Sequence, residues 1–472
     1  MTNTKKSFFL NSLFLTISTI LEKIFFFIIN IIVARYLSKE NFGEYSTALA
    51  FGTFFSIFTN MGVGISSIRA INFYNDEVNE NYTSTLLLKL LLSSTTFLLL
   101  LAAIFITDFN INTIVLTLIL GLVRIFNDFL TSINQLFEAK SRFSISSIYN
   151  SLFAFLFLGG TYFVILFNGD YFQLAYTRLI IVLAVVSLAF FHTFKFYKLK
   201  FNFKIFKKFT KETIPFSYSV VFSSVTTNFS SFLLPIMHGT IYSGIYNNAY
   251  IFFLSLLFIP GNLSRVLIPH LYKHKYEDNA GLFKYAYNTY SKIFSIMSFY
   301  IALIFLLYAG PIIILIFGNK YSDSIYLLQL FAFAVPYAFN MSGTIISSLD
   351  KQIINSRIDI IAAFINIIIS LVLIKYLKAE GAVLSAVFIN IFLYIITNGY
   401  LIAKKYINYK KTAFIRSTLF LITFICYITG KYMTDSYQLL LSILITSILY
   451  GFFVILFLID KEDISLIKSI LK

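Results

Sequence analysis

The chain has 472 residues, of which 58% are hydrophobic and 12% are charged, and its formal net charge is +16. Soluble domains carry roughly twice that share of charged residues, so the composition excludes an ordinary soluble protein. The apolar runs are about 20 residues long, which is the length of a membrane-spanning helix. They do not alternate as barrel strands do, and backbone groups in lipid must pair internally. The sequence therefore predicts an all-α integral membrane protein.

Fourteen apolar runs qualify as spans, and they lie at residues 8–34, 44–68, 84–106, 112–136, 146–167, 173–194, 214–237, 245–269, 287–309, 323–348, 358–375, 381–403, 413–429 and 438–459. A basic segment after the sixth span is the main internal boundary. It predicts four regions, which are spans 1–6, a cytoplasmic linker, spans 7–12, and spans 13–14 with the tail, at residues 1–194, 195–212, 213–403 and 404–472.

Positive residues concentrate on alternate links between the spans. If the N-terminus is cytoplasmic, the cytoplasmic links carry about four times as many Lys and Arg residues as the outward links, which predicts that both termini are cytoplasmic. Seven lysines between Lys195 and Lys211 form the densest group. They are either an amphipathic piece on the anionic inner leaflet or a topology signal without a binding role. A membrane surface explains this charge without a nucleic-acid partner.

A short motif occurs twice, each time ahead of a long apolar run. It reads Gly43-Glu-Tyr45-Ser-Thr-Ala48 and, about 200 residues later, Gly244-Ile-Tyr246-Asn-Asn-Ala249. Two copies at matched places indicate a duplicated membrane unit, although two glycine-containing turns can also coincide by chance. Glycine lets backbones turn or approach closely where a helix begins.

Charged side chains inside the spans are the candidate functional residues. Each costs about 2.5–3.5 kcal/mol on insertion scales, so such residues usually face a cavity or a partner. Glu22 and Lys23 lie near the middle of the first span, where we expect a cavity role. Arg124 and Asp128 are four residues apart on the fourth span, so they either form an ion pair or line a cavity.

Two further arginines leave two interpretations open. Arg265 lies between Pro260 and Pro269, which free backbone carbonyls. Its guanidinium either holds a diphosphate through bidentate hydrogen bonds or binds those carbonyls. Arg69 ends the second span and either meets a lipid diphosphate first or serves as a topology charge.

The remaining intramembrane cations are Lys89, Arg178 and Lys292. They lie within about six residues of a span end, so we expect them to snorkel to the interface. The sequence has no P-loop motif, and its four histidines show no metal-ligand spacing. No nucleophile–base constellation is evident either, so we expect no metal, no bound cofactor and no enzyme active site.

The run Ala34–Tyr45 ahead of the second span resembles the start of polysaccharide-unit flippases of the O-antigen type. These form a family within the multidrug/oligosaccharidyl-lipid/polysaccharide exporter superfamily. Gly244–Ala249, Leu315–Gly318 and Gly381-Ala382 also fit that family in order and spacing. Many relatives carry an acidic residue in the seventh helix, where this chain has Ser230.

The resemblance implies two six-helix lobes around a central cavity, plus two C-terminal helices. It implies movement of an undecaprenyl-pyrophosphate-linked repeat unit from the inner to the outer leaflet of the bacterial inner membrane. Alternating access coupled to H+ or Na+ would drive this movement. Expected partners are the lipid-linked glycan, membrane lipids and other polysaccharide-assembly membrane proteins. We expect a cluster of cations and acids to serve the diphosphate, namely Lys23, Arg69, Arg124 and Arg265 as cavity cations and Glu22 and Asp128 as coupling acids.

Two other functions remain open from the sequence. A membrane oligosaccharide polymerase or glycosyltransferase needs a catalytic surface, but the longest outward link has about 13 residues, at 310–322. A small-molecule cation antiporter of the same superfamily would favour an acidic cavity. Here the cations inside the spans outnumber the acids, which favours an anionic ligand.

Overall fold

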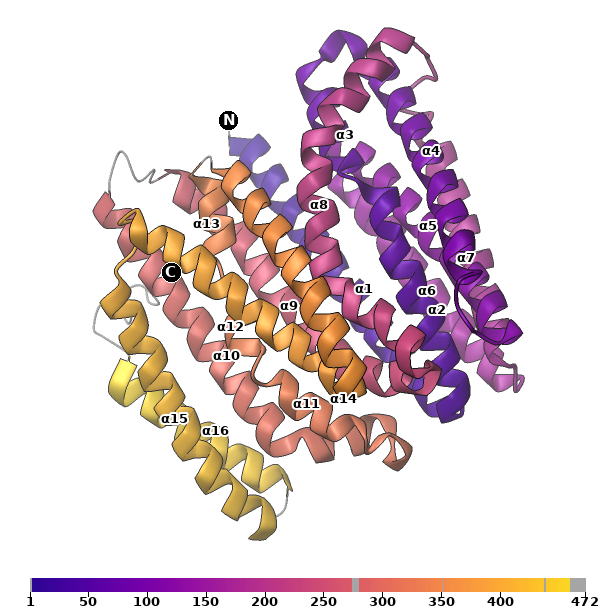
Figure 1. Cartoon of the computed structure of the whole chain (residues 1–472). Helices are drawn as coiled ribbons and strands as arrows, with labels where there is room; N and C mark the ends of the chain where they lie inside the picture. Colours follow the sequence, from indigo (N-terminus) through magenta and orange to yellow (C-terminus); the bar gives the residue numbers. More distant parts are fainter. Residues whose placement is uncertain (1, 274–279, 350, 437–438, 459–472) are drawn as a thin grey trace. The chain divides into compact units, whose positions relative to one another are not determined.

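The computed structural model describes residues 2–273, 280–349, 351–436 and 439–458. In this part of the chain the structure is helical throughout (Figure 1). The α-helices of the first half are α1 (Thr2–Tyr36), α2 (Lys39–Asn60), α3 (Val63–Phe73), α4 (Val78–Ile104), α5 (Ile111–Ala139), α6 (Phe143–Leu166), α7 (Tyr171–Thr193), α8 (Phe203–His238) and α9 (Thr240–Lys273). Those of the second half are α10 (Ala280–Phe317), α11 (Ser324–Phe331), α12 (Val335–Ala338), α13 (Ser342–Ser348), α14 (Gln352–Ala403), α15 (Tyr409–Ser436) and α16 (Leu439–Leu458).

The helices account for the predicted number of membrane crossings. In the described residues, 12 helices are long and apolar enough to span a membrane, and the bent set α11–α13 makes 13. α14 has 52 residues with a non-helical Lys378 inside it (φ 52°, ψ −126°). At 1.5 Å per residue it is about twice as long as a bilayer core needs, so it supplies two crossings. The prediction of an all-α integral membrane protein with about fourteen spans is confirmed.

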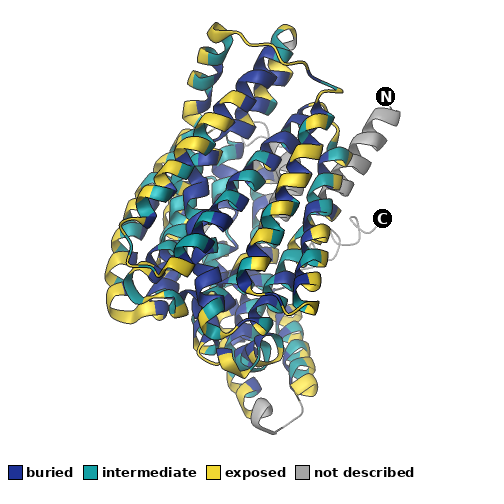
Figure 2. Ribbon diagram, turned by 90° about the vertical axis from the view of Figure 1, so that its right-hand side faces the viewer, coloured by how far each residue is buried: buried dark blue, intermediate teal, exposed yellow. Residues whose placement is uncertain are grey.

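The chain divides into two compact units. The N-terminal unit comprises Met1–Asn247 and Ala363–Ala382, and the C-terminal unit comprises Asn248–Ala362 and Val383–Lys472. The region boundaries expected from the sequence stay a prediction. Within the units, helices bury the faces that they turn to one another, and many large apolar side chains remain exposed on the other faces (Figure 2). Such exposed apolar faces are typical of helices in contact with lipid.

Two predicted spans are wrong as continuous helices. The span at 44–68 is divided into α2 and α3 by Met61 and Gly62, whose φ angles are positive. The span at 323–348 consists of α11, α12 and α13, with a bend of 45°. Both breaks lie inside stretches that pass as a single apolar span when hydropathy is averaged, so the average did not reveal them. The predicted outward link at 310–322 is also shorter, because α10 continues through Pro311 to Phe317.

The two copies of the glycine motif touch each other inside the N-terminal unit. A Cβ added to Gly43 would lie 2.6 Å from the carbonyl oxygen of Thr240, and one added to Gly244 would lie 3.1 Å from Gly43 Cα. Only glycine permits this approach between α2 and α9. Tyr45 and Tyr246 are buried beside it. The close backbone approach is thus confirmed, while the duplication of the unit stays a prediction.

Candidate functional site

The candidate site is built around the break between α2 and α3 in the N-terminal unit. Met61 and Gly62 have φ angles of 28° and 71°, which interrupt the helical hydrogen-bond ladder. A Cβ on Gly62 would lie 2.8 Å from Phe216 Cβ, so both the backbone angle and the space require glycine. A helix that ends inside a membrane protein leaves carbonyl groups that need other donors.

Side chains from two other helices bind the freed carbonyls. Lys89 Nζ, from α4, donates to the carbonyl oxygen of Thr59 at 2.8 Å. Ser217 Oγ, from α8, donates to the carbonyl oxygen of Met61 at 2.7 Å. The last carbonyls of a helix form the negative end of its dipole, which favours a cation. A lysine and a serine therefore replace the missing helical donors.

An acid from α5 completes this arrangement. Thr59 Oγ1 donates to Asp128 Oδ2 at 2.5 Å, so Thr59 links Lys89 to a carboxylate. Arg124 lies one turn earlier, with its Nη2 3.6 Å from Asp128 Oδ1. The Arg124 Nε also donates to Ser56 Oγ at 3.2 Å. Arg124 and Asp128 thus form the ion pair that their spacing allows.

The members of this group differ sharply in exposure. Lys89 is 1% exposed and Asp128 is 5% exposed, whereas the Arg124 side chain is 40% exposed. Glu22, from α1, is half-buried and lies within electrostatic reach of Arg124. We call Glu22, Lys89, Arg124 and Asp128 the charge cluster. It balances two basic groups with two acidic groups, which lowers the cost of removing charges from water. Arg124 is its member that an outside group can reach.

The structure places the predicted site residues differently from one another. The charge cluster brings together Glu22, Arg124 and Asp128. Lys23 is exposed on α1. Arg69 is exposed on α3, with its guanidinium 5.8 Å from the ring centre of Phe73. Arg265 belongs to α9, and its side chain lies outside the described residues.

The snorkelling prediction is wrong for Lys89 and Lys292, which are 1% and 6% exposed. α4 begins at Val78 rather than at residue 84, so Lys89 lies about three turns into the helix. Arg178 is half-buried, and its guanidinium lies 4.7 Å from the ring centre of Phe157 and 5.6 Å from that of Phe26. Sequence reasoning named Lys89 among the intramembrane cations but expected it at the interface rather than in the site. The sequence showed a charged residue within a run of leucines, but it did not show that the carbonyl oxygen of Thr59 on α2 would be its partner.

The position of Ser230 on α8 carries no charge. Ser230 Oγ lies 2.9 Å from Ser370 Oγ, and both residues are buried. Asn366 Nδ2 donates to the carbonyl oxygen of Thr226 at 3.0 Å in the same region. At this position α8 therefore contacts α14 through hydroxyl and amide groups rather than through charged side chains. Across the described part of the chain, no three His, Cys, Asp or Glu side chains gather into a metal-binding group.

Comparison with known proteins gives this architecture a family. A family model described as polysaccharide biosynthesis protein matches residues 9–275. The chain belongs to the polysaccharide biosynthesis protein family. The matched residues include all four members of the charge cluster. The capsular polysaccharide biosynthesis protein CapF of Staphylococcus aureus is 25% identical over 394 residues, which cover 79% of this chain and 93% of CapF.

Solved transporters share the fold of this family member. The lipid II flippase MurJ, in an inward closed conformation, matches with a TM-score of 0.75 and 16% identity, over 94% of this chain and 98% of that chain. An inward-facing multidrug resistance MATE family transporter of the MOP superfamily matches with a TM-score of 0.62 and 15% identity, over 80% and 95% of the two chains. The chain therefore belongs to a family of polysaccharide biosynthesis proteins and has the fold of solved MOP superfamily transporters.

Proposed function

We propose that this transporter is a flippase for undecaprenyl-pyrophosphate-linked oligosaccharide repeat units, of the O-antigen type or similar. It moves them from the inner to the outer leaflet of the bacterial inner membrane by ion-coupled alternating access. The family supports a role in polysaccharide biosynthesis, and a flippase named for lipid II has the same fold. The observation that carries the proposal is the half-exposed Arg124 beside the buried Asp128 and Lys89.

Arg124 is the proposed contact for the diphosphate. A diphosphate cannot cross hydrocarbon unaided, because charges are costly there. The planar guanidinium presents a fork of donors that matches phosphate oxygens. Arg124 is 40% exposed on its side chain, whereas Asp128 behind it is nearly buried. The acid weakens the local positive potential, which keeps the ligand releasable.

Protonation of Asp128 is the proposed switch that sets how strongly Arg124 holds the diphosphate. Ionised Asp128 attracts Arg124 at 3.6 Å and accepts the hydroxyl of Thr59. When the carboxylate gains a proton, this attraction ends, and Arg124 binds the diphosphate more strongly. When the proton leaves, Asp128 draws Arg124 back and the diphosphate is released. Glu22 acts in the same sense because it lies within electrostatic reach of Arg124.

Other residues serve the same route in this proposal. Lys23 and Arg69 are exposed cations on α1 and α3, and they meet the diphosphate before or after Arg124. Arg265 is proposed as a third contact on α9. Membrane lipids and other polysaccharide-assembly membrane proteins are the proposed partners.

The proposed orientation has both termini in the cytoplasm, and it is testable because the chain has one cysteine, Cys426. In a Cys426→Ser background, Glu40→Cys should react with a membrane-impermeant thiol reagent in intact cells. Lys351→Cys should react only after permeabilisation. Both positions are exposed in the structure. The reverse pattern would overturn the orientation.

The decisive test is a leaflet assay with purified protein in vesicles. A lipid-linked repeat unit is placed in one leaflet, and its appearance in the other is measured with an impermeant glycan-modifying enzyme. The wild type should translocate it, and Arg124→Gln should be about tenfold slower because a charge-assisted bond is lost. Arg124→Lys should be intermediate, and Arg142→Gln, at an exposed loop position, is the control.

Equal rates for Arg124→Gln and the wild type would overturn the role of the arginine. Absence of wild-type translocation would overturn the flippase. Transport of organic cations by the same vesicles, without transport of the glycan, would establish the cation antiporter instead.

A further inference from the structure

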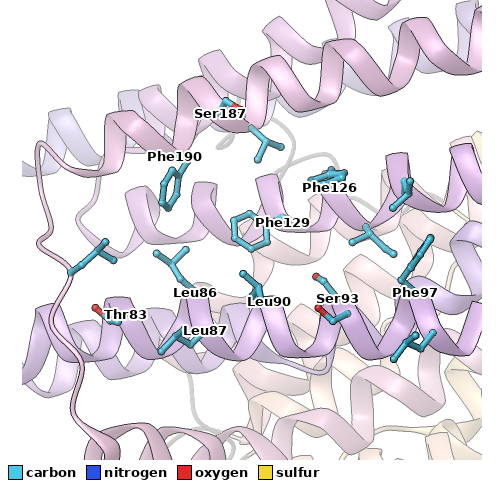
Figure 3. A pocket seen from close by; sticks show the side chains of 16 residues that line it. Thr83, Leu86, Leu87, Leu90, Ser93, Phe97, Phe126, Phe129, Ser187 and Phe190 are labelled. Atoms are coloured by element: carbon cyan, nitrogen blue, oxygen red, sulfur yellow. The ribbon is translucent and has the colours of Figure 1, made fainter.

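A long apolar groove lies in the N-terminal unit, apart from the charge cluster. Its volume is about 780 Å³, and it lies along α4 with side chains from α5 and α7 (Figure 3). α5 packs against both α4 and α7 and forms its floor. Leucine and phenylalanine side chains dominate its lining, among them Leu86, Leu90, Phe97, Phe126, Phe129 and Phe190. A hydrocarbon chain suits such a surface better than any polar ligand.

The groove is longer than one leaflet of a bilayer. Its lining on α4 extends from Thr83 to Leu98. At 1.5 Å per residue this is about 22 Å along the helix axis. One leaflet contributes about half of a hydrocarbon core of roughly 30 Å, which is about 15 Å. A chain that fills the groove therefore continues beyond the bilayer middle, where ordinary acyl chains end.

One end of the groove is fixed by the basic segment before α8. The backbone N–H of Lys198 donates to Asn79 Oδ1 at 2.8 Å, and that of Lys200 donates to Thr83 Oγ1 at 2.8 Å. These bonds hold Leu199 against the groove, which it lines. The mouth is therefore a built feature rather than a loose loop.

The mouth carries a surplus of positive charge. Lys200 pairs with Glu80 at 2.6 Å, and Lys208 pairs with Glu77 at 3.3 Å. The other lysines of the segment have exposed side chains, and they are Lys195, Lys198, Lys204, Lys207 and Lys211. An anionic headgroup at the membrane surface complements this charge, and each lysine near the surface contributes about 1 kcal/mol to such attraction.

We propose that the groove binds the polyprenyl chain of a phosphate-bearing carrier lipid, with its phosphate at the lysines of residues 195–211. The lipid is a polyisoprenoid phosphate or diphosphate, whose chain exceeds one leaflet as the groove does. This inference rests on the proposed function and adds to it. The groove on α4, α5 and α7 holds the chain of the carrier while its phosphate lies at these lysines, before the diphosphate moves to Arg124.

The test uses the full-length protein in nanodiscs of phosphatidylcholine that contain a photoactivatable polyprenyl phosphate. Leu90 and Leu91 give a matched pair, because they are 55% and 52% exposed and only Leu90 lines the groove. Leu90→Trp should lower cross-linking to α4 and α7 peptides about tenfold, because it fills the groove and displaces several methylenes. Leu91→Trp should leave it unchanged. Lys198→Gln with Lys204→Gln should also lower cross-linking, whereas an uncharged polyprenol should bind more weakly than the phosphate.

Equal cross-linking in Leu90→Trp and Leu91→Trp would overturn the proposal that the groove binds the polyprenyl chain. Equal competition by phosphatidylglycerol would also overturn it, since the site would then hold any anionic membrane lipid. The leaflet assay on the same preparations separates the two proposals. If the protein translocates the lipid but Leu90→Trp does not lower cross-linking, the groove proposal alone is wrong. If Leu90→Trp lowers cross-linking but the wild type translocates nothing, the flippase proposal alone is wrong.

Discussion

Two membrane spans of this protein are broken, and each unit contains one of them. In the N-terminal unit, Lys89 Nζ binds the carbonyl oxygen of Thr59 where α2 ends, at 2.8 Å. In the C-terminal unit, Arg416 Nη2 binds the carbonyl oxygen of Pro336 in α12, also at 2.8 Å. The freed carbonyl at each break is therefore satisfied in the same way. A cation from a neighbouring helix replaces a lost helical donor.

The surroundings of the two cations differ. Lys89 lies within electrostatic reach of the Asp128 carboxylate. Arg416 lies over aromatic rings, with its guanidinium 4.0 Å from the ring centre of Tyr394 and 5.1 Å from that of Tyr337. Arginine stays charged at all physiological pH values. The break in the N-terminal unit thus has a carboxylate near its cation, whereas the cation at the break in the C-terminal unit lies among aromatic rings.

Uncharged groups complete the break in the C-terminal unit. Asn398 Oδ1 accepts hydrogen bonds from Tyr287 OH at 2.9 Å and from Ser342 Oγ at 3.0 Å. Asn340 Nδ2 donates to Thr397 Oγ1 at 2.9 Å. Such a network fixes one geometry and does not titrate. The carboxylate beside the break, rather than the broken helix itself, is therefore what distinguishes the N-terminal unit.

The largest expected effect is that of Lys89→Met. It removes the cation from a buried group and leaves acids unbalanced, so it should destabilise the protein by about 3–5 kcal/mol. The drop in thermal midpoint in detergent measures this loss. Adding Asp128→Asn should restore part of the stability, because it removes one of the unbalanced acids. If Asp128→Asn in that background lowers the midpoint further, the electrostatic account of this break is wrong.

Asp128→Asn alone should act on transport rather than on folding, since asparagine still accepts the hydroxyl of Thr59. Arg124 loses its competing acid, so diphosphate lipid should bind about tenfold tighter, which corresponds to about 1.4 kcal/mol. Turnover in the leaflet assay should fall accordingly. Binding by the variant should depend less on pH than binding by the wild type, because one of the two acids near Arg124 is gone. Glu40→Gln, at an exposed acid, is the control and should keep the wild-type profile.

Gly62→Ala tests whether the backbone at the break in the N-terminal unit requires glycine more strictly than the backbone near the break in the C-terminal unit. The added Cβ would lie 2.8 Å from Phe216 Cβ at a φ of 71°, so we expect a loss of about 1–3 kcal/mol. Gly343→Ala, next to the break in the C-terminal unit, meets the amide side chain of Asn355 at 3.3 Å. That contact can relax, and the loss should stay below about 1 kcal/mol. Equal thermal midpoints for the two variants would contradict the need for glycine at residue 62.

Arg416→Lys should have the smallest effect. It keeps the charge and a donor for the carbonyl of Pro336 but loses planar stacking on the rings, so we expect a loss of about 0.5–1 kcal/mol. The pH dependence of transport should match that of the wild type, because no acid is involved. A changed pH profile would break the distinction between the two units.

The sequence predicted those features that depend on one helix at a time. The number of spans followed from hydropathy, and the pairing of Arg124 with Asp128 was one of two outcomes that their spacing allowed. The burial of Lys89 depended on a carbonyl that only the break in α2 makes available. The bond from Arg416 to a carbonyl of another helix likewise depends on a break in a distant segment. Partners that come from distant segments leave no periodicity to read.

The contact between Gly43 and Gly244 has a mechanical consequence. It joins backbone to backbone, so no side chain there can rotate to change the separation of α2 from α9. Gly62 lies 19 residues further along, about 28 Å away at 1.5 Å per residue. The start of α2 is thus held by a rigid contact, and the break at Met61 and Gly62 lies beside the charge cluster. A change in that cluster therefore acts where the hydrogen-bond ladder of the helix is already interrupted.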